Sequence, residues 1–253
     1  QIILPGEIAP PHRHAASALR FIIEGRNAYT AVGGERTTMS PGDFVITPSM
    51  AWHDHGHEGE GPMVWLDGLD MHIVNFFGAS FREGYPGRTQ PLHRPEGAAM
   101  AEAGSNLLPV DHEWGTLTSP IFNYPYARTR EALHQLSRAR AADPWHGFKM
   151  KYINPVNGGW AMPTIATWMQ LLPAGLQTKP YRSTDSTVYT VVEGQGHSIV
   201  GGQRFDWGPH DIFVAPSWVP HHHVAAGDAV LFGYSDRVVH EKLDLWREER
   251  LEG

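Results

Sequence analysis

The sequence contains no cysteine among its 253 residues. Disulfide bonds and thiolate metal ligands are therefore excluded, and any transition-metal site must be built from histidine and carboxylate side chains. Sixteen histidines are present, so these residues require an explanation.

Positive charge is also scarce. Lys and Arg number 20 against 27 Asp and Glu, which gives a formal net charge of −7. Nucleic acids and anionic membranes are bound by clustered positive charge, so we expect neither as a partner. No apolar stretch approaches the roughly 18 residues that cross a bilayer, and no secretory signal opens the chain. These absences predict a cytoplasmic protein that acts on small molecules.

Glycine and proline are plentiful, at 27 and 20 residues, while hydrophobic residues make up 41% of the chain. This composition is typical of a globular protein that is rich in turns. The chain begins at Gln1, without Met, in an apolar stretch that resembles the middle of a strand. We therefore expect that N-terminal sequence is missing.

An internal duplication organises the chain. Two stretches that are rich in β-branched and aromatic residues match at an offset of 169, and later positions match at 168. Each copy contains short strand-like runs separated by turn residues, which is the pattern of a β-sandwich or barrel. The matching segments are Leu19–Gly25 with Val188–Gly194, Gly33–Arg36 with Gly201–Arg204, and His53 with His221. The expected strands include Phe21–Ile23, Phe44–Thr47, Thr187–Val192 and Ile212–Ala215. Between the copies, residues 129–142 favour a helix.

The first copy carries a possible metal site. His12 and His14 lie two residues apart, so on a strand they share a face while Arg13 points away. His53, from a neighbouring strand, would complete a three-imidazole cap with open coordination positions. A lone histidine is more often an ordinary core or surface residue, but the trio at this spacing predicts metal binding.

The positions of Gly6, Gly25, Gly42 and Pro48 around these histidines resemble the two motifs of the cupin superfamily. The resemblance implies an all-β bicupin, with two jelly-roll (double-stranded β-helix) barrels joined by a partly helical linker. We predict an N-terminal metal-binding barrel at 1–85, a linker at 86–160 and a C-terminal barrel at 161–253. Many cupins have a glutamate ligand where this chain has Ala18, so the expected site has three histidines and no carboxylate.

The alternation of side chains along strands predicts which residues surround the metal. Arg20 lies two residues beyond Ala18 and could hold a carboxylate, although it could also form a surface ion pair at the rim. His55 lies two beyond His53 and could donate to a substrate or move a proton, or be a fourth ligand or a structural residue. Trp65 and Asp67 share a face of Met63–Asp67 and could line the pocket or simply pack in the core. His57 receives no role.

The second copy keeps the scaffold and loses the ligands. Tyr181 and Ser183 stand where the first copy has His12 and His14, and Tyr189 replaces Arg20. His221 and His223 remain. Tyrosine and serine are poor ligands for a divalent transition metal, so we interpret this barrel as structural, with a weak second metal site as the less favoured alternative.

A closer resemblance is to the gentisate 1,2-dioxygenase family, which also includes salicylate and 1-hydroxy-2-naphthoate 1,2-dioxygenases. It covers nearly the whole chain. The resembling segments are Pro5–His14, Ala18–Ile22, Gly34–Met39, Trp52–His55, Trp65–Asp70, Tyr152–Pro155, Gly158–Gly159 and Asp211–Trp218.

This resemblance implies that the chain cleaves gentisate with dioxygen to maleylpyruvate in aromatic catabolism; salicylate and 1-hydroxy-2-naphthoate remain alternatives. It implies a homo-oligomer, with a tetramer favoured, and an additional N-terminal region. A non-redox cupin, either an isomerase or a binding protein, is the alternative of another class. The implied site has Fe(II) on His12, His14 and His53, substrate-binding residues Gln1, Arg20, His55, Trp65 and Asp67, and catalytic residues His55 and Arg20.

Overall fold

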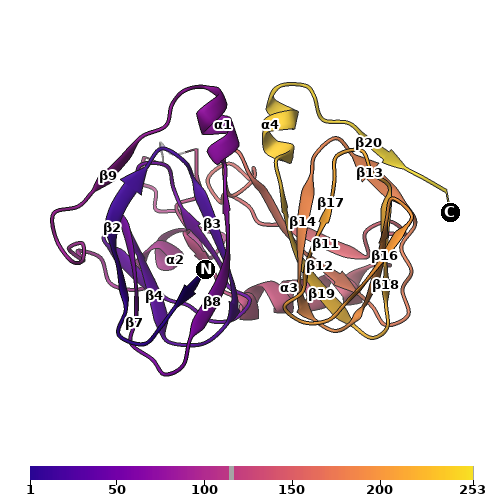
Figure 1. The fold of residues 1–253 in the computed structure, drawn as a ribbon, viewed down its shortest axis with the longest axis horizontal. Helices are drawn as coiled ribbons and strands as arrows, with labels where there is room; N and C mark the ends of the chain where they lie inside the picture. The colour runs from indigo at the N-terminus through magenta and orange to yellow at the C-terminus, as the bar shows by residue number, and fades with distance from the viewer. Residues whose placement is uncertain (114–116, 253) are drawn as a thin grey trace. The chain divides into compact units, whose positions relative to one another are not determined.

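The computed structural model describes residues 1–113 and 117–252. The chain forms two compact units (Figure 1). The first comprises Gln1–Arg128 with Asn154–Met162, and the second comprises Thr129–Ile153 with Pro163–Gly253. Each unit is built mainly from antiparallel strands, which confirms the predicted all-β fold class.

The first unit contains two five-stranded sheets. Apolar side chains such as Phe21, Phe44 and Trp65 fill its core and are at most 1% exposed. In spatial order, one sheet is β1 (Ile2–Ile3), β8 (Met63–Leu69), β3 (Ala18–Glu24), β6 (Phe44–Thr47) and β10 (Asn123–Tyr124). The other sheet is β5 (Glu35–Thr38), β4 (Ala28–Val32), β7 (His53–His57), β2 (Ile8–His14) and β9 (Arg82–Gly84).

The second unit repeats this plan with two more five-stranded sheets. One sheet is β11 (Phe148–Lys151), β12 (Ala166–Leu172), β19 (Ala229–Ser235), β14 (Thr187–Glu193) and β17 (Ile212–Ala215). The other is β16 (Gln203–Trp207), β15 (Gly196–Val200), β18 (His221–Ala225), β13 (Tyr181–Ser183) and β20 (Glu248–Arg250). All four strands predicted from β-branched and aromatic runs are present.

The duplication extends to the register of the strands. In the first unit β2 pairs with β7 at His12 and His53, and the equivalent pair in the second unit joins β13 to β18 at Tyr181 and His221. Both copies also place a glycine with positive φ directly after the same strand, at Gly25 and Gly194. A Cβ on Gly25 would lie 2.6 Å from the carbonyl oxygen of Pro62, so the turn requires glycine.

The helices are short except for one in the linker. They are α1 (Met71–Phe76), α2 (Ala98–Ala103), α3 (Tyr126–Ala139) and α4 (Arg237–Lys242). The predicted helix at 129–142 corresponds to α3, which begins and ends three residues earlier. Its start is fixed by a distant residue, because Oδ1 of Asp43 accepts a hydrogen bond from the backbone N–H of Tyr126 at 2.9 Å. None of the helices in the described part of the chain is long and apolar enough to cross a membrane.

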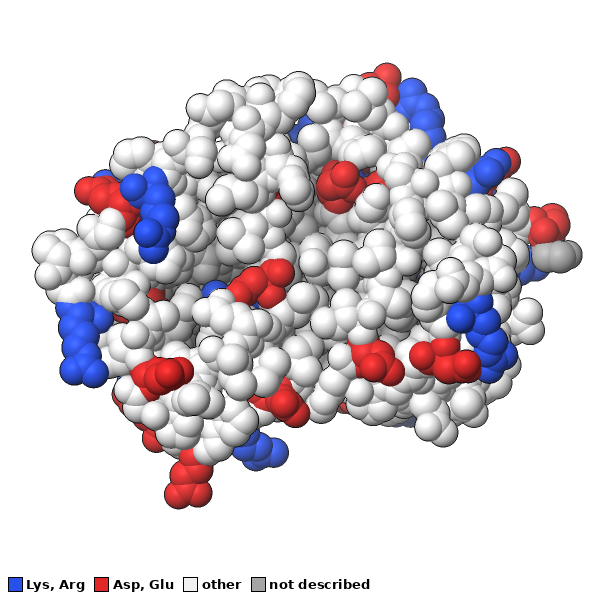
Figure 2. All heavy atoms as spheres, in the orientation of Figure 1, with Lys and Arg blue, Asp and Glu red and all other residues white. Residues whose placement is uncertain are grey.

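Charged side chains are dispersed on the face of the molecule shown in Figure 2. Lys and Arg lie singly there, most of them beside Asp or Glu. Surface ion pairs such as Arg182 with Glu249 have this character.

Candidate metal centre and substrate site

Three histidines from two adjacent strands meet inside the first unit. His12 and His14 lie on β2 and His53 lies on β7, and their potential ligand atoms are all within 4.8 Å of one another. The ring centroids of His12 and His53 are 4.3 Å apart. The grouping predicted from strand parity is therefore present. Among the described residues, it is the group of histidine or acidic side chains that could hold a metal ion.

Each of these rings is held by a backbone carbonyl through Nδ1. A carbonyl oxygen can only accept a hydrogen bond, so each Nδ1 must carry the proton and each Nε2 must carry a free lone pair. Carbonyl contacts of this kind commonly orient histidine ligands of metals. The contacts join His12 to Pro10 at 3.0 Å, His14 to Ala16 at 2.7 Å and His53 to Ala51 at 3.0 Å.

Burial favours the neutral form of two of the three histidines. Desolvation lowers the pKa of His53 to about 3 and also lowers the pKa of His12. Neutral imidazoles with free Nε2 atoms suit a divalent transition metal. Ala18, which occupies the place of the carboxylate ligand in many cupins, is buried on β3. The donor set thus fits a three-histidine metal centre.

The intervening Arg13 points away from the cluster, as predicted. Its guanidinium forms an ion pair with Glu83 and stacks on Trp52 with a centroid distance of 4.8 Å.

Arg20 is buried inside the first unit, and not at a surface rim. Its Nη2 lies 3.1 Å from Oδ1 of Asp67, and its guanidinium stacks on Trp65 at 5.0 Å. Nε1 of Trp65 donates to the other oxygen of Asp67 at 3.1 Å. The three residues therefore form one connected group on neighbouring strands β3 and β8.

His55 lies beside this group and beside the histidine cluster. Its ring centroid is 5.8 Å from that of His53 and 6.0 Å from that of Trp65. Its Nδ1 lies 2.7 Å from Oγ1 of Thr30 and 3.3 Å from Nη1 of Arg20. Burial, followed by the charge of Arg20, holds the pKa of His55 well below its ordinary value, so the ring is neutral at pH 7.

Gln1 reaches the same region through its backbone. Its amino group donates to the carbonyl of Trp65 at 2.9 Å, and its backbone carbonyl accepts from the N–H of Trp65 at 3.0 Å. The residue itself is exposed. His57 has a local structural contact, because its Nε2 lies 2.7 Å from the carbonyl of Gly61.

Two residues near the site were not predicted from the sequence. Thr30 contacts His55 from β4, and Arg82 on β9 pairs in register with His14. Thr30 lies in a strand whose five residues are all buried, and nothing in its local sequence distinguishes it. Arg82 belongs to a three-residue strand that lies 68 positions beyond His14, and no sequence periodicity connects the two.

In the second unit His221 already has a side-chain partner. Nε2 of His221, the counterpart of His53, lies 3.2 Å from the hydroxyl of Tyr189. Tyr189 pairs in register with Gly233, just as Arg20 pairs with Asp67. The space freed by Gly233 is filled by Trp168, whose Nε1 lies 2.4 Å from the position of an added Cβ. Aromatic packing thus replaces the ion pair of the first unit.

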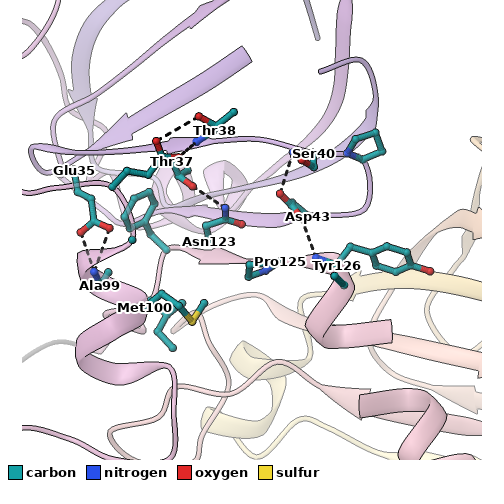
Figure 3. Close-up of a pocket in the computed structure, with 16 residues that line it drawn as sticks. Glu35, Thr37, Thr38, Ser40, Asp43, Ala99, Met100, Asn123, Pro125 and Tyr126 are labelled. Carbon is teal, nitrogen blue, oxygen red and sulfur yellow. Dashed lines mark hydrogen bonds between the residues drawn. The ribbon is translucent and has the colours of Figure 1, made fainter. Parts of the chain in front are cut away.

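A separate pocket of about 540 Å³ lies in the first unit, where β5 and the loop that follows it meet α2, β10 and the start of α3 (Figure 3). Two of its polar side chains make contacts within the fold: Glu35 accepts from the N–H of Ala99, and Asn123 donates to Thr37. None of the histidines or substrate-binding candidates lines it. The pocket therefore belongs to the packing of the linker, and not to the metal centre.

The chain matches the family of cupin domains over residues 1–69 and 167–232. It is 56% identical over 250 residues to "Gentisate 1,2 dioxygenase 1" of Aquipseudomonas alcaligenes, covering 99% of this chain and 72% of that protein. It is 37% identical to a 5-aminosalicylate 1,2-dioxygenase of a Comamonas species, covering 98% of this chain and 67% of that protein.

Among solved structures it resembles a variant of the salicylate 1,2-dioxygenase of Pseudoaminobacter salicylatoxidans in complex with gentisate. The TM-score is 0.93 at 33% identity, covering 100% of this chain and 72% of that one. The two segments matched by the cupin family agree with the duplicated barrel, and the names of the relatives favour a dioxygenase over a non-redox cupin. The chain belongs to the gentisate 1,2-dioxygenase family of bicupin enzymes, and it is a ring-cleaving dioxygenase.

Proposed function

We propose that the enzyme opens the ring of gentisate (2,5-dihydroxybenzoate), using iron(II) held by His12, His14 and His53. The bond between the carboxyl-bearing carbon and the adjacent hydroxyl-bearing carbon breaks, both atoms of one dioxygen molecule enter the product, and maleylpyruvate results. The observation that carries the proposal is the three-imidazole cluster with all three Nε2 atoms free, directly beside Arg20 and His55.

Bound iron would supply a Lewis acid that can exchange electrons with the ring and with dioxygen. The site residues suit a substrate that carries its own negative charge. Three neutral imidazoles leave the +2 charge of the ion uncompensated, and a carboxylate with an ionised ortho hydroxyl would balance it. Ala18 leaves space where other cupins place a carboxylate ligand.

The surrounding side chains would bind and orient the ring. The guanidinium of Arg20 can donate to a carboxylate, and the neutral ring of His55 can donate to an oxygen of the substrate. Trp65 and Asp67 hold Arg20 in place, and Gln1 borders the same strand edge.

Gentisate is preferred over salicylate and 1-hydroxy-2-naphthoate as the proposed substrate because a relative that is named for gentisate is 56% identical to this chain, whereas one named for 1-hydroxy-2-naphthoate is 34% identical. The solved relative in complex with gentisate is 33% identical. A homo-oligomeric assembly remains a prediction.

The test is an oxygen-uptake assay. The protein is loaded anaerobically with Fe(II), gentisate is added, air is admitted, and oxygen consumption is followed together with the near-ultraviolet absorbance of the opened product. Uptake of one dioxygen per gentisate, absent in His12→Ala, supports the proposal. No uptake with gentisate but uptake with salicylate or 1-hydroxy-2-naphthoate changes the substrate. No oxygen uptake with any of the three substrates contradicts the iron-dependent reaction.

A further inference from the structure

Thr30 and His55 form a directly paired hydroxyl and imidazole inside the first barrel. The two residues face each other in register on β4 and β7, and their exposures are 0% and 3%. Oγ1 of Thr30 lies 2.7 Å from Nδ1 of His55, which is the shortest contact that this ring makes with a described side chain.

The direction of this hydrogen bond follows from a third residue. Nη1 of Arg20 lies 3.3 Å from the same Nδ1 and 3.4 Å from Oγ1 of Thr30. A guanidinium can only donate, so a proton on Nδ1 would point at another donor. The position of Arg20 therefore favours the tautomer of His55 that has its lone pair on Nδ1 and its proton on Nε2.

Thr30 has a second possible acceptor, since its Oγ1 lies 3.2 Å from the backbone carbonyl of Asp54. If the hydroxyl donated there, Nδ1 of His55 would have to carry the proton and to donate to Thr30, beside the cation of Arg20. The longer distance to Asp54 and the position of Arg20 both favour donation from Thr30 to His55.

The other ring nitrogen of His55, Nε2, is available for a hydrogen bond to a ligand. Among the described residues, none accepts a hydrogen bond from Nε2 of His55, and this atom is not one of the side-chain nitrogens that are sealed inside the protein without a partner. We propose that Thr30 is a positioning residue that fixes His55 as the tautomer protonated on Nε2, so that His55 presents a hydrogen-bond donor to an oxygen atom of the bound substrate.

This tautomer is opposite to that of the three proposed metal ligands, whose Nδ1 atoms donate to backbone carbonyls. A histidine with its proton on Nε2 has no lone pair there for a metal. Thr30 thereby keeps His55 out of the ligand set, although His55 lies only two residues from His53. The role toward the substrate rests on the proposed function, whereas the tautomer does not.

The second barrel provides a matched control. Ser198 and His223 form the equivalent pair, in register on β15 and β18, with Oγ of Ser198 2.8 Å from Nδ1 of His223. Nε1 of Trp207 donates to the same Oγ at 2.9 Å. Ser198→Ala therefore removes a buried hydroxyl from the same place in the fold, away from the proposed centre.

The first measurement is long-range proton–nitrogen NMR correlation of the imidazoles in the full chain, without metal and with diamagnetic zinc(II). The His55 signals are assigned by their loss in His55→Gln. We expect Nε2 of His55 to carry the proton, and Nδ1 to carry it in His12, His14 and His53, which serve as internal references. A proton on Nδ1 of His55 in the unmodified chain overturns the inference, whatever the variants do.

The second measurement uses the iron-loaded enzyme with gentisate. Thr30→Val, which keeps the shape, should lower kcat about tenfold with KM changed less than about twofold, and should alter the His55 signals. Thr30→Ser should restore both, and Ser198→Ala should leave both unchanged. Unaltered signals and kcat in Thr30→Val contradict the role of Thr30. If no hydroxybenzoate is turned over by the unmodified enzyme, the proposed function fails, and the NMR spectrum still decides the tautomer.

Discussion

Arg20 and Asp67 form an ion pair inside the first barrel, with Nη2 of Arg20 3.1 Å from Oδ1 of Asp67. The guanidinium is therefore already balanced by a carboxylate. A substrate carboxylate would meet a directional donor there, and not an isolated positive charge, so most of the charge compensation for a dianionic substrate would fall to the metal.

Removal of the carboxylate should destabilise the first barrel. Asp67→Asn leaves the buried charge of Arg20 without its partner, and we expect the free energy of unfolding to fall by about 3 kcal/mol, measured by urea denaturation. Glu249→Gln, which breaks the exposed pair with Arg182, should change it by less than about 0.5 kcal/mol. Equal effects of the two substitutions would show that Asp67 does not stabilise the buried charge of Arg20.

The three clustered histidines should be required together for metal binding. His12→Ala, His14→Ala and His53→Ala should each weaken binding at least about hundredfold, since loss even of a residue that supports a ligand costs 10-fold to 100-fold. Metal content per chain and calorimetric titration would measure this. His222→Ala, on β18 of the second unit, should retain one metal per chain. A variant of the cluster with unchanged affinity would refute its place in the centre.

The stability of the second barrel should decrease in acid. Burial lowers the pKa of His221 to about 4, while an unfolded histidine titrates near 6.5. Between these values the unfolded chain binds a proton that the folded chain does not, so the free energy of unfolding falls as the pH drops from about 6.5 to 4, by up to about 1.4 kcal/mol per unit for this group.

His221→Gln should remove that part of the slope when unfolding is measured at several pH values, and His134→Gln, on the exposed side of α3, should not. Parallel pH profiles for His221→Gln and the unmodified chain would exclude His221 as a source of the acid sensitivity.

The glycine that replaces Asp67 in the second barrel should be intolerant of a side chain. An added Cβ on Gly233 would lie 2.4 Å from Nε1 of Trp168, so Gly233→Ala should cost about 1 to 3 kcal/mol through displacement of the indole. Gly208→Ala, where no atom lies within 4 Å of the new Cβ, should cost much less. Thermal unfolding of both variants gives the comparison, and similar midpoints would mean that Trp168 moves freely.

The parts of this structure that depend on short-range periodicity could be predicted from the sequence. The duplication placed the strands, and alternation along β2 and β7 placed His12, His14 and His53 together while directing Arg13 outward. The same parity brought Arg20, His55, Trp65 and Asp67 to one region, as the distances among them confirm.

The remaining features depend on contacts between distant segments. The start of α3 is fixed by Asp43, which lies 83 residues before Tyr126. The pairing of Thr30 with His55 and of Arg82 with His14 depends on the register of whole strands, which local patterns do not reveal. Likewise, the burial of Arg20 could not be distinguished from a rim position, because strand parity gives the direction of a side chain and not its depth.

The carbonyls that hold the three Nδ1 atoms have one property in common: each lies only two residues from its own histidine along the chain. The orientation of each imidazole ring is thus fixed within its own short segment and does not depend on a side chain elsewhere in the barrel. Residues of the surrounding pocket can therefore be exchanged in evolution without misdirecting the ligands. This independence gives a structural reason why relatives named for different aromatic acids can share one scaffold.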